Sequence, residues 1–402
     1  MTAFPGRRFA VSRIVVIAVP IICGDALAQA SAGKGPGTAE SPKSSAPAAT
    51  GNPTPPRGPY RSVLPLAAPK IFEDAEKAAP NSVPSAEPAL KEESESSPGA
   101  APSAYGASTA PYTTARVAVQ TLGNSTTAAN TPVASFPYRA TGKLYFKVGA
   151  EVAVCTASLV KPGVLITAAH CVFDFGKGSK GWYSGWVWCP ANTSADGGAY
   201  GCYSAGSART FATYIDGTDV CAQRGVVCND DIATLLVAPK NGVLAGKVLG
   251  WYRHGWNDPS YKPSPLLGNV TVLQITQLGY SSALDGGYQM ERTDAVGWYY
   301  ASGNLKNTQI GSAQAGGSSG GPWLINFGTP PVFDPASSSP GASSRQFIVG
   351  VTSYGSSSID FNRQGASYFG RNSQYNETYG SYGSGNIGRL MSDTCTANPT
   401  YC

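Results

Sequence analysis

Short apolar runs rich in β-branched residues alternate, along the C-terminal two thirds of the chain, with segments of Gly, Pro and Ser. The runs lie at Leu144–Val148, Val152–Val160, Val164–Thr167, Ile232–Val237, Val270–Ile275, Pro322–Phe327 and Phe347–Ser353. Their lengths and their turn-forming flanks are typical of β-strands. No segment carries a sustained apolar stripe with a period of 3.6 residues, so we expect little helix and an all-β fold.

The hydrophobic pattern changes before residue 133. Residues 29 to about 115 hold 15 of the 31 prolines, no Trp and only four aromatic residues, so they cannot bury enough apolar surface to offset chain entropy. We expect a disordered tether or pro-segment over 29–132, in which only Val63–Phe72 is apolar enough to contact the folded part. The folded unit is predicted at 133–402, large enough for two packed barrels, at about 133–255 and about 266–394.

The first 28 residues have the layout of a secretory signal. Arg7, Arg8 and Arg13 precede an apolar stretch from Ile14 to Cys23, and Ala26-Leu27-Ala28 supplies the small residues of a cleavage site. A buried N-terminal helix is the alternative interpretation. No apolar run reaches the roughly 18 residues of a membrane-spanning helix. The chain is therefore predicted to be secreted, into an extracellular or periplasmic space, without a membrane partner.

Charge excludes one further class of partner. Charged residues make up 13% of the chain and the net charge is +5, and cleavage after residue 28 would remove three arginines and one aspartate. So small an excess of positive charge does not predict binding to nucleic acid.

Export changes the interpretation of the cysteines. Beyond Cys23 the chain has an even number, namely Cys155, Cys171, Cys189, Cys202, Cys221, Cys228, Cys395 and Cys402. An even number in an oxidising compartment predicts disulfides, and the spacing favours bridges between neighbours, although eight cysteines allow 105 connectivities. A zinc site is the alternative, but the chain has no Cys-x-x-Cys pair and only two histidines, so we expect no metal.

Three short motifs carry candidate chemistry, in order along the chain. The run LITAAHC places His170 at the end of an apolar strand, and DDIATLL places a carboxylate at the head of another. The third, GGSSGGP, places Ser319 in a turn whose glycines can expose backbone N–H groups. Ser319 would be the nucleophile, His170 the base, and Asp231 the group that orients the imidazole, with Asp230 as its competitor.

The same turn supplies an oxyanion hole. The N–H groups of Gly317 and Ser319 are its candidate donors. Acyl transfer by these residues moves protons and acyl groups only, so no cofactor is expected. The second histidine, His254, lies in a Gly- and Pro-rich stretch and is expected to be structural.

Order and motifs together resemble the chymotrypsin-like serine peptidases, and the opening FPYRATGKL at residues 136–144 resembles the start of secreted bacterial members. TAAHC, D-I-A-x-L and G-x-S-G-G-P are all present, and GVTSYG at residues 350–355 is similar to the family's substrate-binding strand. The resemblance implies two packed six-stranded antiparallel β-barrels and a serine endopeptidase acting on protein or peptide substrates. It also implies that Ser353, Tyr354 and Gly355 receive the extended substrate, and that Ser353 supports the catalytic carboxylate.

Departures from the family pattern bear on activation and specificity. Ser318 stands where activated members carry an Asp that pairs with a newly formed N-terminus, so that ion pair is absent. Ala313 stands at the base of the primary pocket, and Thr352 replaces the His of glutamyl-specific relatives. We therefore expect cleavage after apolar or small residues.

Two alternatives and two lesser expectations remain. A catalytically inactive binding protein on the same fold, or an esterase, could carry the same motifs. The chain is expected to be a monomer. Phe173 to Asn229 and Phe327 to Arg345 are expected to be long surface loops.

Overall fold

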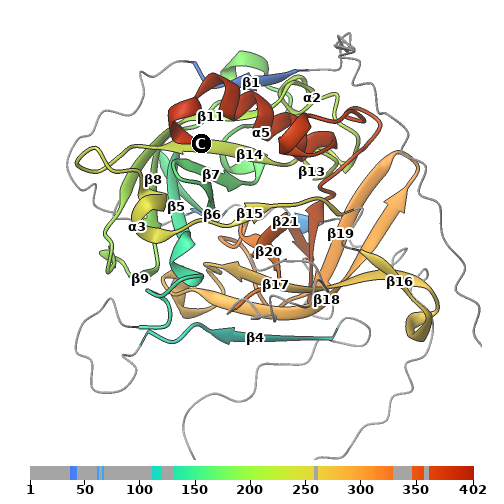
Figure 1. Ribbon diagram of the computed structural model, residues 1–402, viewed down its shortest axis with the longest axis horizontal. Helices are drawn as coiled ribbons and strands as arrows, with labels where there is room; N and C mark the ends of the chain where they lie inside the picture. Colours follow the sequence, from blue (N-terminus) through green and yellow to red (C-terminus); the bar gives the residue numbers. More distant parts are fainter. Residues whose placement is uncertain are drawn as a thin grey trace, which may run out of the picture. The chain divides into compact units, whose positions relative to one another are not determined.

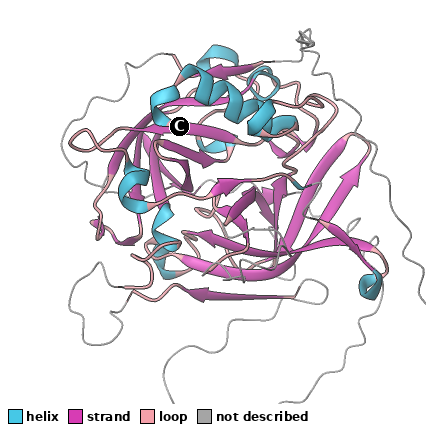
Figure 2. Cartoon of the chain, viewed as in Figure 1, coloured by secondary structure: helices cyan, strands magenta, loops and turns pink. Residues whose placement is uncertain are grey.

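The computed structural model describes residues 37–42, 61–62, 66–67, 111–119, 131–257, 261–328, 346–356 and 362–402. All of them belong to one compact unit, Gly35–Cys402. They form two antiparallel six-stranded barrels with few helices (Figure 1 and Figure 2). The predicted fold class is confirmed. The predicted signal segment lies outside the described residues.

Barrel one is a sheet whose end strands pair with each other. Its strands follow one another in the order β8 (Ser184–Pro190), β5 (Thr141–Val148), β6 (Glu151–Lys161), β7 (Val164–Thr167), β14 (Ala233–Val237) and β11 (Tyr203–Phe211), and β11 pairs with β8 to close it. Leu144, Phe146, Leu165 and Trp188 are fully buried inside. The apolar side chains of short β-branched strands thus fill the interior, as expected for a closed sheet.

Barrel two is closed in the same way but has a more polar interior. Its order is β17 (Val270–Gly279), β20 (Pro322–Ile325), β21 (Phe347–Ser356), β22 (Arg363–Ser367), β19 (Leu305–Gly311) and β18 (Glu291–Ser302), and β18 pairs with β17. Ile275, Ile310 and Trp323 form an apolar cluster. Gln277 and Gln364 are fully buried beside them.

In the described parts of the predicted tether region, four strands add to these sheets. β1 (Thr38–Glu40) pairs with β11, and β4 (Tyr112–Arg116) pairs with β18. β2 (Arg61–Ser62) pairs with β6, and β3 (Leu66–Ala67) pairs with β21. The domain boundary at residue 133 stays a prediction, but both sheets include residues that precede it.

The other strands and the α-helices among the described residues are not among the twelve barrel strands. They are β9 (Asn192–Ser194), β10 (Gly197–Gly198), α2 (Ala212–Asp216), β12 (Cys221–Gln223), β13 (Val226–Cys228), α3 (Ala245–Leu249), β15 (Arg253–His254), β16 (Lys262–Ser264) and α5 (Gly385–Ala397). In the part of the chain that the structure describes, no helix is long and apolar enough to cross a membrane.

Two expectations from the sequence need correction. The segment from Phe173 to Asn229 is not a surface loop, because β8 and β11 within it complete barrel one. The C-terminal helix α5, which the pattern did not predict, lies over β11 and β14 (Figure 1). Ile387, Leu390 and Met391 share its buried face. Its sequence opens with Gly-Asn-Ile-Gly, and the apolar residues Ile387, Leu390 and Met391 are too few to form a sustained apolar stripe.

The cysteines pair with their sequence neighbours. The four disulfides are Cys155–Cys171, Cys189–Cys202, Cys221–Cys228 and Cys395–Cys402. Of the 105 connectivities that the sequence left open, the structure therefore contains the one that the spacing favoured.

Candidate active site

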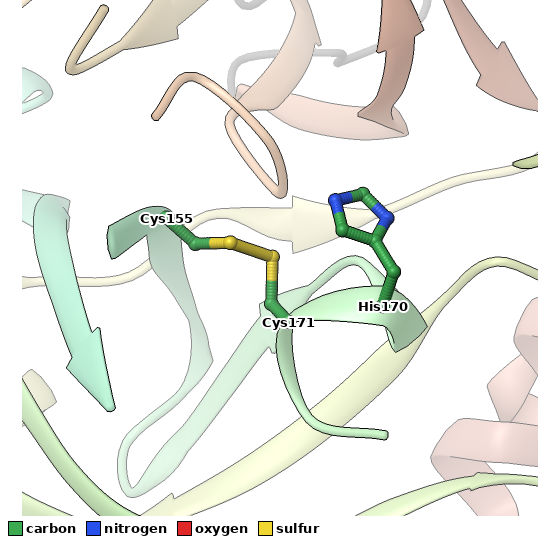
Figure 3. Close-up of side chains that lie close together, drawn as sticks. All are labelled: Cys155, His170 and Cys171. Carbon is green, nitrogen blue, oxygen red and sulfur yellow. A yellow bond between two sulfur atoms is a disulfide. The ribbon is translucent and has the colours of Figure 1, made fainter. Parts of the chain in front are cut away.

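His170 lies at the point where β7 ends. The strand stops at Thr167, and residues Ala169–Cys171 form one short 3-10 turn. A disulfide joins Cys171 to Cys155 of β6, and Figure 3 shows the imidazole projecting beside this bridge. The turn that carries His170 is thus covalently fixed to the neighbouring strand.

Asp231 reaches the imidazole because β14, which it precedes, pairs with β7. Ala233 is opposite Thr167, so the residues just outside this pair face each other. Asp231 Oδ2 lies 2.7 Å from His170 Nδ1, and Asp231 Oδ1 accepts the backbone N–H of His170 at 2.9 Å. A carboxylate only accepts, so Nδ1 carries the proton in the neutral ring and Nε2 carries the lone pair.

A serine from barrel two also binds this carboxylate. Ser353 Oγ donates to Asp231 Oδ2 at 2.5 Å, and the Asp231 N–H donates to Ser367 Oγ at 3.1 Å. Asp231 is fully buried. The hydrogen bonds from His170 and Ser353 compensate the cost of holding a carboxylate there.

Asp230, the competing carboxylate, has different partners. Its Oδ1 accepts the side-chain amides of Asn372 at 2.8 Å and Asn386 at 3.1 Å. Burial raises the pKa of Asp230 to about 7. The structure therefore brings Asp231, not Asp230, to the imidazole.

The loop that carries Ser319 joins β19 to β20 and is tied to barrel one. The N–H of Thr156 donates to Ser319 O at 2.7 Å, and Thr156 Oγ1 donates to Gly317 O at 2.9 Å. Gly320 has a φ of 77°, and a Cβ there would lie 2.0 Å from Thr167 Oγ1. Only glycine permits this approach, which brings the Ser319 loop against Thr156 in the middle of β6 and against the end of β7, which His170 follows.

Two carbonyl groups of this loop are fixed, and they fix the direction of two N–H groups. Gly316 O accepts the N–H and the hydroxyl of Ser282, both at 2.7 Å. Ser318 O accepts the N–H of Gly321 at 2.8 Å. In a trans peptide the N–H points away from its carbonyl, so the N–H groups of Gly317 and Ser319 point away from Ser282 and Gly321 respectively.

A neutral network supports the loop from inside barrel two. Ser318 Oγ donates to Ala315 O at 2.7 Å and accepts Gln364 Nε2 at 3.1 Å. Gln364 Nε2 also donates to Gln314 O at 2.7 Å, and Gln277 Nε2 donates to Gln364 Oε1. Sequence reasoning noted that Ser318 replaces an Asp, but it missed the side chains of Gln277 and Gln364.

The strand β21 carries the predicted substrate-binding residues. Ser353 faces Asp231, whereas the ring of Tyr354 packs against Gly365, where an added Cβ would clash with it. Tyr354 is fully buried in a cluster with Val226 and Val227 of the Cys221–Cys228 hairpin. Ser353, Tyr354 and Gly355 thus lie on one strand, but the side chain of Tyr354 is covered by the Cys221–Cys228 hairpin.

Ala313, the predicted pocket base, lies six residues before Ser319 and is half-buried. Its N–H donates to Thr114 Oγ1 of β4 at 3.3 Å. The N-terminal strand β4 therefore contacts the segment that would form the floor of the pocket.

Two groups in the described ranges bring cysteine together with another possible metal ligand. One is Cys155, His170 and Cys171 (Figure 3), and the other is Asp219, Cys221 and Cys228. In both, the cysteines are disulfide-bonded, so their sulfurs are not the thiolates that bind metal. Neither group fits a metal ion.

The second histidine has a structural role. His254 Nε2 lies 3.0 Å from Tyr382 O, and burial lowers the pKa of His254 to about 4. It is a neutral hydrogen-bond donor that joins β15 to Tyr382 of the C-terminal segment.

Comparison with known proteins gives structural likeness only. No family model matches the chain, and no curated protein matches it. A thermostable serine protease from an extremophilic microorganism is 21% identical, with a TM-score of 0.44 over 58% of this chain and 92% of its own. The protease Anisep from Arthrobacter nicotinovorans is 20% identical, with a TM-score of 0.43 over 58% of this chain and 90% of its own. A Glu endopeptidase is 15% identical, with a TM-score of 0.40 over 66% of this chain and 94% of its own.

Proposed function

We propose that this chain is a secreted serine endopeptidase that acts on protein or peptide substrates through His170, Asp231 and Ser319. The observation that carries the proposal is the buried Asp231 carboxylate, which holds His170 Nδ1 at 2.7 Å while Thr156 of β6 holds the Ser319 loop. The four disulfides and the signal-like N-terminus support an oxidising, extracytoplasmic compartment.

The chemistry follows from the tautomer that Asp231 selects. His170 Nε2 takes the Ser319 hydroxyl proton as Oγ attacks the scissile carbonyl carbon, and the carbonyl oxygen becomes an oxyanion. When the tetrahedral species collapses, His170 returns the proton to the leaving amine and an acyl-serine remains. Water then repeats the sequence and releases the acid. Asp231 stays ionised and stabilises the imidazolium.

The N–H groups of Gly317 and Ser319 would receive the oxyanion. Their direction is set before substrate arrives, because the carbonyls of Gly316 and Ser318 are already hydrogen-bonded. Donors that need no reorganisation contribute about 3–4 kcal/mol each to transition-state stabilisation in comparable sites. The loop is thus suited to acyl transfer.

Specificity is proposed for apolar or small side chains before the scissile bond. Ala313 places no charge at the pocket base, and the hydroxyl of Thr352 is occupied by Gln277 and Trp323. A basic or acidic side chain would find no partner of opposite charge on these residues. Cleavage of a peptide library centred on Ala, Leu, Lys and Glu would measure the preference.

The decisive experiment is labelling with a fluorophosphonate probe, followed by mass spectrometry of the modified peptide. Ser319 should be labelled, Ser319→Ala should abolish labelling and peptide hydrolysis, and Ser318→Ala should still be labelled at Ser319. Folded wild-type protein that neither labels nor cleaves would favour the inactive binding protein. Cleavage of esters with no cleavage of peptides would favour the esterase.

A matched pair of variants tests the carboxylate. Asp231→Asn should lower kcat by about 10⁴, because the amide favours the wrong tautomer of His170. Asp230→Asn keeps an oxygen that can accept from Asn372 and Asn386, so it should retain activity within a few fold. Equal losses in both variants would contradict the assignment.

A further inference from the structure

Beside the nucleophile, strand β6 of barrel one has an edge that no other strand of the barrel covers. Such an edge is called an open edge below. β7 covers this edge only from Ser158 onward. Nearer the start of β6, the same edge directs the N–H of Thr156 to Ser319 O at 2.7 Å. Backbone groups two residues apart point the same way, so Val154 presents its own N–H and C=O to this side.

The barrel-two strand β21 has an open edge on the other side of the nucleophile. β20 pairs with it only as far as Val351, and Gly320 and Gly321 then bond to Thr352. Ser353 follows and binds the catalytic carboxylate. Beyond it, Gly355 and Ser356 continue along an edge that no strand of the barrel covers.

Both open edges are occupied by strands from the N-terminal region of this chain. β2 pairs in parallel with β6, with Arg61 opposite Ala153 and Ser62 opposite Val154. β3 pairs in parallel with β21, with Leu66 opposite Gly355 and Ala67 opposite Ser356. Four Cα–Cα steps join Ser62 to Leu66, a span of at most about 14 Å. The two anchoring points therefore lie close together, one on each side of Ser319.

We propose that β2 and β3 hold the full-length chain in a latent form by occupying the edges that an extended peptide substrate must pair with. A row of N–H and C=O groups on a strand edge pairs with one chain at a time, so substrate and this segment compete. The segment is tethered, and its effective concentration is about millimolar, which gives it an advantage over dilute substrate. The inference rests on the proposed function.

The competition has a signature that depends on substrate length. A small acylating reagent needs only Ser319, His170 and the oxyanion donors, whereas the backbone pairs of β2 and β3 are with Ala153, Val154, Gly355 and Ser356. A peptide of eight residues needs the edges as well. Release of the segment should therefore speed hydrolysis of long peptides by about 10-fold or more at micromolar substrate, while fluorophosphonate labelling should change less than threefold.

Proline substitution tests the pairing because proline has no N–H to donate. The variants are Arg61→Pro/Ser62→Pro and Leu66→Pro/Ala67→Pro in the full-length chain. The matched control is Ser85→Pro/Ala86→Pro, in a stretch that already contains Pro84 and Pro88. Thermal melting confirms that the barrels are intact in each variant.

Two readouts separate this proposal from the proposed function. Hydrogen exchange at the amide of Val154, and at the one of the Gly355 and Ser356 amides that points toward β3, should accelerate in both test variants and not in the control. Hydrolysis of quenched-fluorescent octapeptides with Ala or Leu at the centre should accelerate in the same two variants.

Each outcome decides one of the two claims. Unchanged hydrogen exchange overturns the occupancy, and faster exchange with an unchanged octapeptide rate overturns the latency. Failure of every form to react with fluorophosphonate overturns the peptidase, whereas faster exchange in the proline variants would still support occupancy of the two edges.

Discussion

Replacing Gln364 with leucine should damage catalysis through the loop that carries the nucleophile. The side chain is fully buried in β22, and its amide nitrogen donates to Gln314 O at 2.7 Å and to Ser318 Oγ at 3.1 Å. Its amide oxygen accepts Gln277 Nε2. Gln364 therefore holds two residues of the segment that leads to Ser319, although it does not itself meet substrate.

The magnitude follows from what each partner retains. Ser318 Oγ keeps its bond to Ala315 O, and Gln277 Nε2 keeps its bond to Thr352 Oγ1. Gln314 O loses the donor that Gln364 provides, and an unpaired buried acceptor costs about 1–3 kcal/mol. We expect a loss of about 2 kcal/mol in the free energy of unfolding. If displacement of the Ser319 loop raises the activation free energy by the same amount, about 2 kcal/mol, kcat falls about 30-fold.

The assay compares kcat and KM for a peptide substrate with the thermal midpoint in two variants. Gln346→Leu is the matched control, since Gln346 is also buried at barrel two but its amide donates to Gly328 O. Gln364→Leu should lower kcat while Gln346→Leu lowers only the midpoint. If both variants lose stability and both keep kcat within twofold, Gln364 does not position the loop.

Three further predictions concern charge and disulfides. Burial, and after it Asp285, raises the pKa of Glu291 to about 8, so folded Glu291 stays protonated while the unfolded chain ionises above about 4.5. The free energy of unfolding should therefore fall as pH rises from 5 to 8, by up to about 4 kcal/mol relative to Glu291→Gln. The measurement is thermal melting of both proteins over this pH range, and an equal dependence of stability on pH in the two would refute the prediction. Burial lowers the pKa of Lys143 to about 8, whereas in the unfolded chain it stays near 10.5. Between pH 8 and 10 the unfolded chain therefore holds a proton that the folded chain has lost, so the free energy of unfolding should rise with pH. Denaturant titrations should show a smaller rise in Lys143→Met. Replacing Cys155 and Cys171 with serine should lower the free energy of unfolding by about 3 kcal/mol and should also lower kcat. Replacing Cys395 and Cys402 with serine should lower the melting temperature and leave kcat unchanged. The reverse pattern would contradict the role given to the His170 turn.

The sequence predicted those strands whose buried faces are apolar. Val164–Thr167 was predicted with the bounds that β7 has, and Phe347–Ser353 is the first part of β21. β11 was missed because its sequence YSAGSARTF alternates small and polar residues, which by composition resembles a loop. The strand pattern of barrel two is partly obscured in the sequence for a different reason. Gln277, Gln309 and Gln364 are buried inside it, so period-two alternation does not show as hydrophobic against polar.

The candidate site also has a part that the sequence predicted and a part that it did not. Short motifs indicated His170 and Asp231, because a strand followed by a tight turn and a carboxylate just before an apolar strand both have recognisable sequences. The choice of Asp231 over Asp230 rested on one residue of spacing, and the geometry at the imidazole supports it. Gln364 could not be found from the sequence. It lies 46 residues from its partner Ser318, and a single glutamine in a Gly- and Ser-rich stretch carries no pattern.

The neutral network and the segment on the open edges have a joint consequence for how latency works. In proteases whose nucleophile loop is ordered by a newly formed charge, latency resides in the loop. Here Ser318 and Gln364 are already hydrogen-bonded in the full-length chain, and the carbonyls of Gly316 and Ser318 are already fixed. Under the proposed mechanism, latency acts on substrate pairing at the edges that β2 and β3 cover, and leaves the oxyanion donors as they are. Full-length protein should react with a small fluorophosphonate at nearly the rate of the proline variants, yet cleave octapeptides more slowly than they do. Equal slowing of both reactions would place the block at the loop and contradict this mechanism.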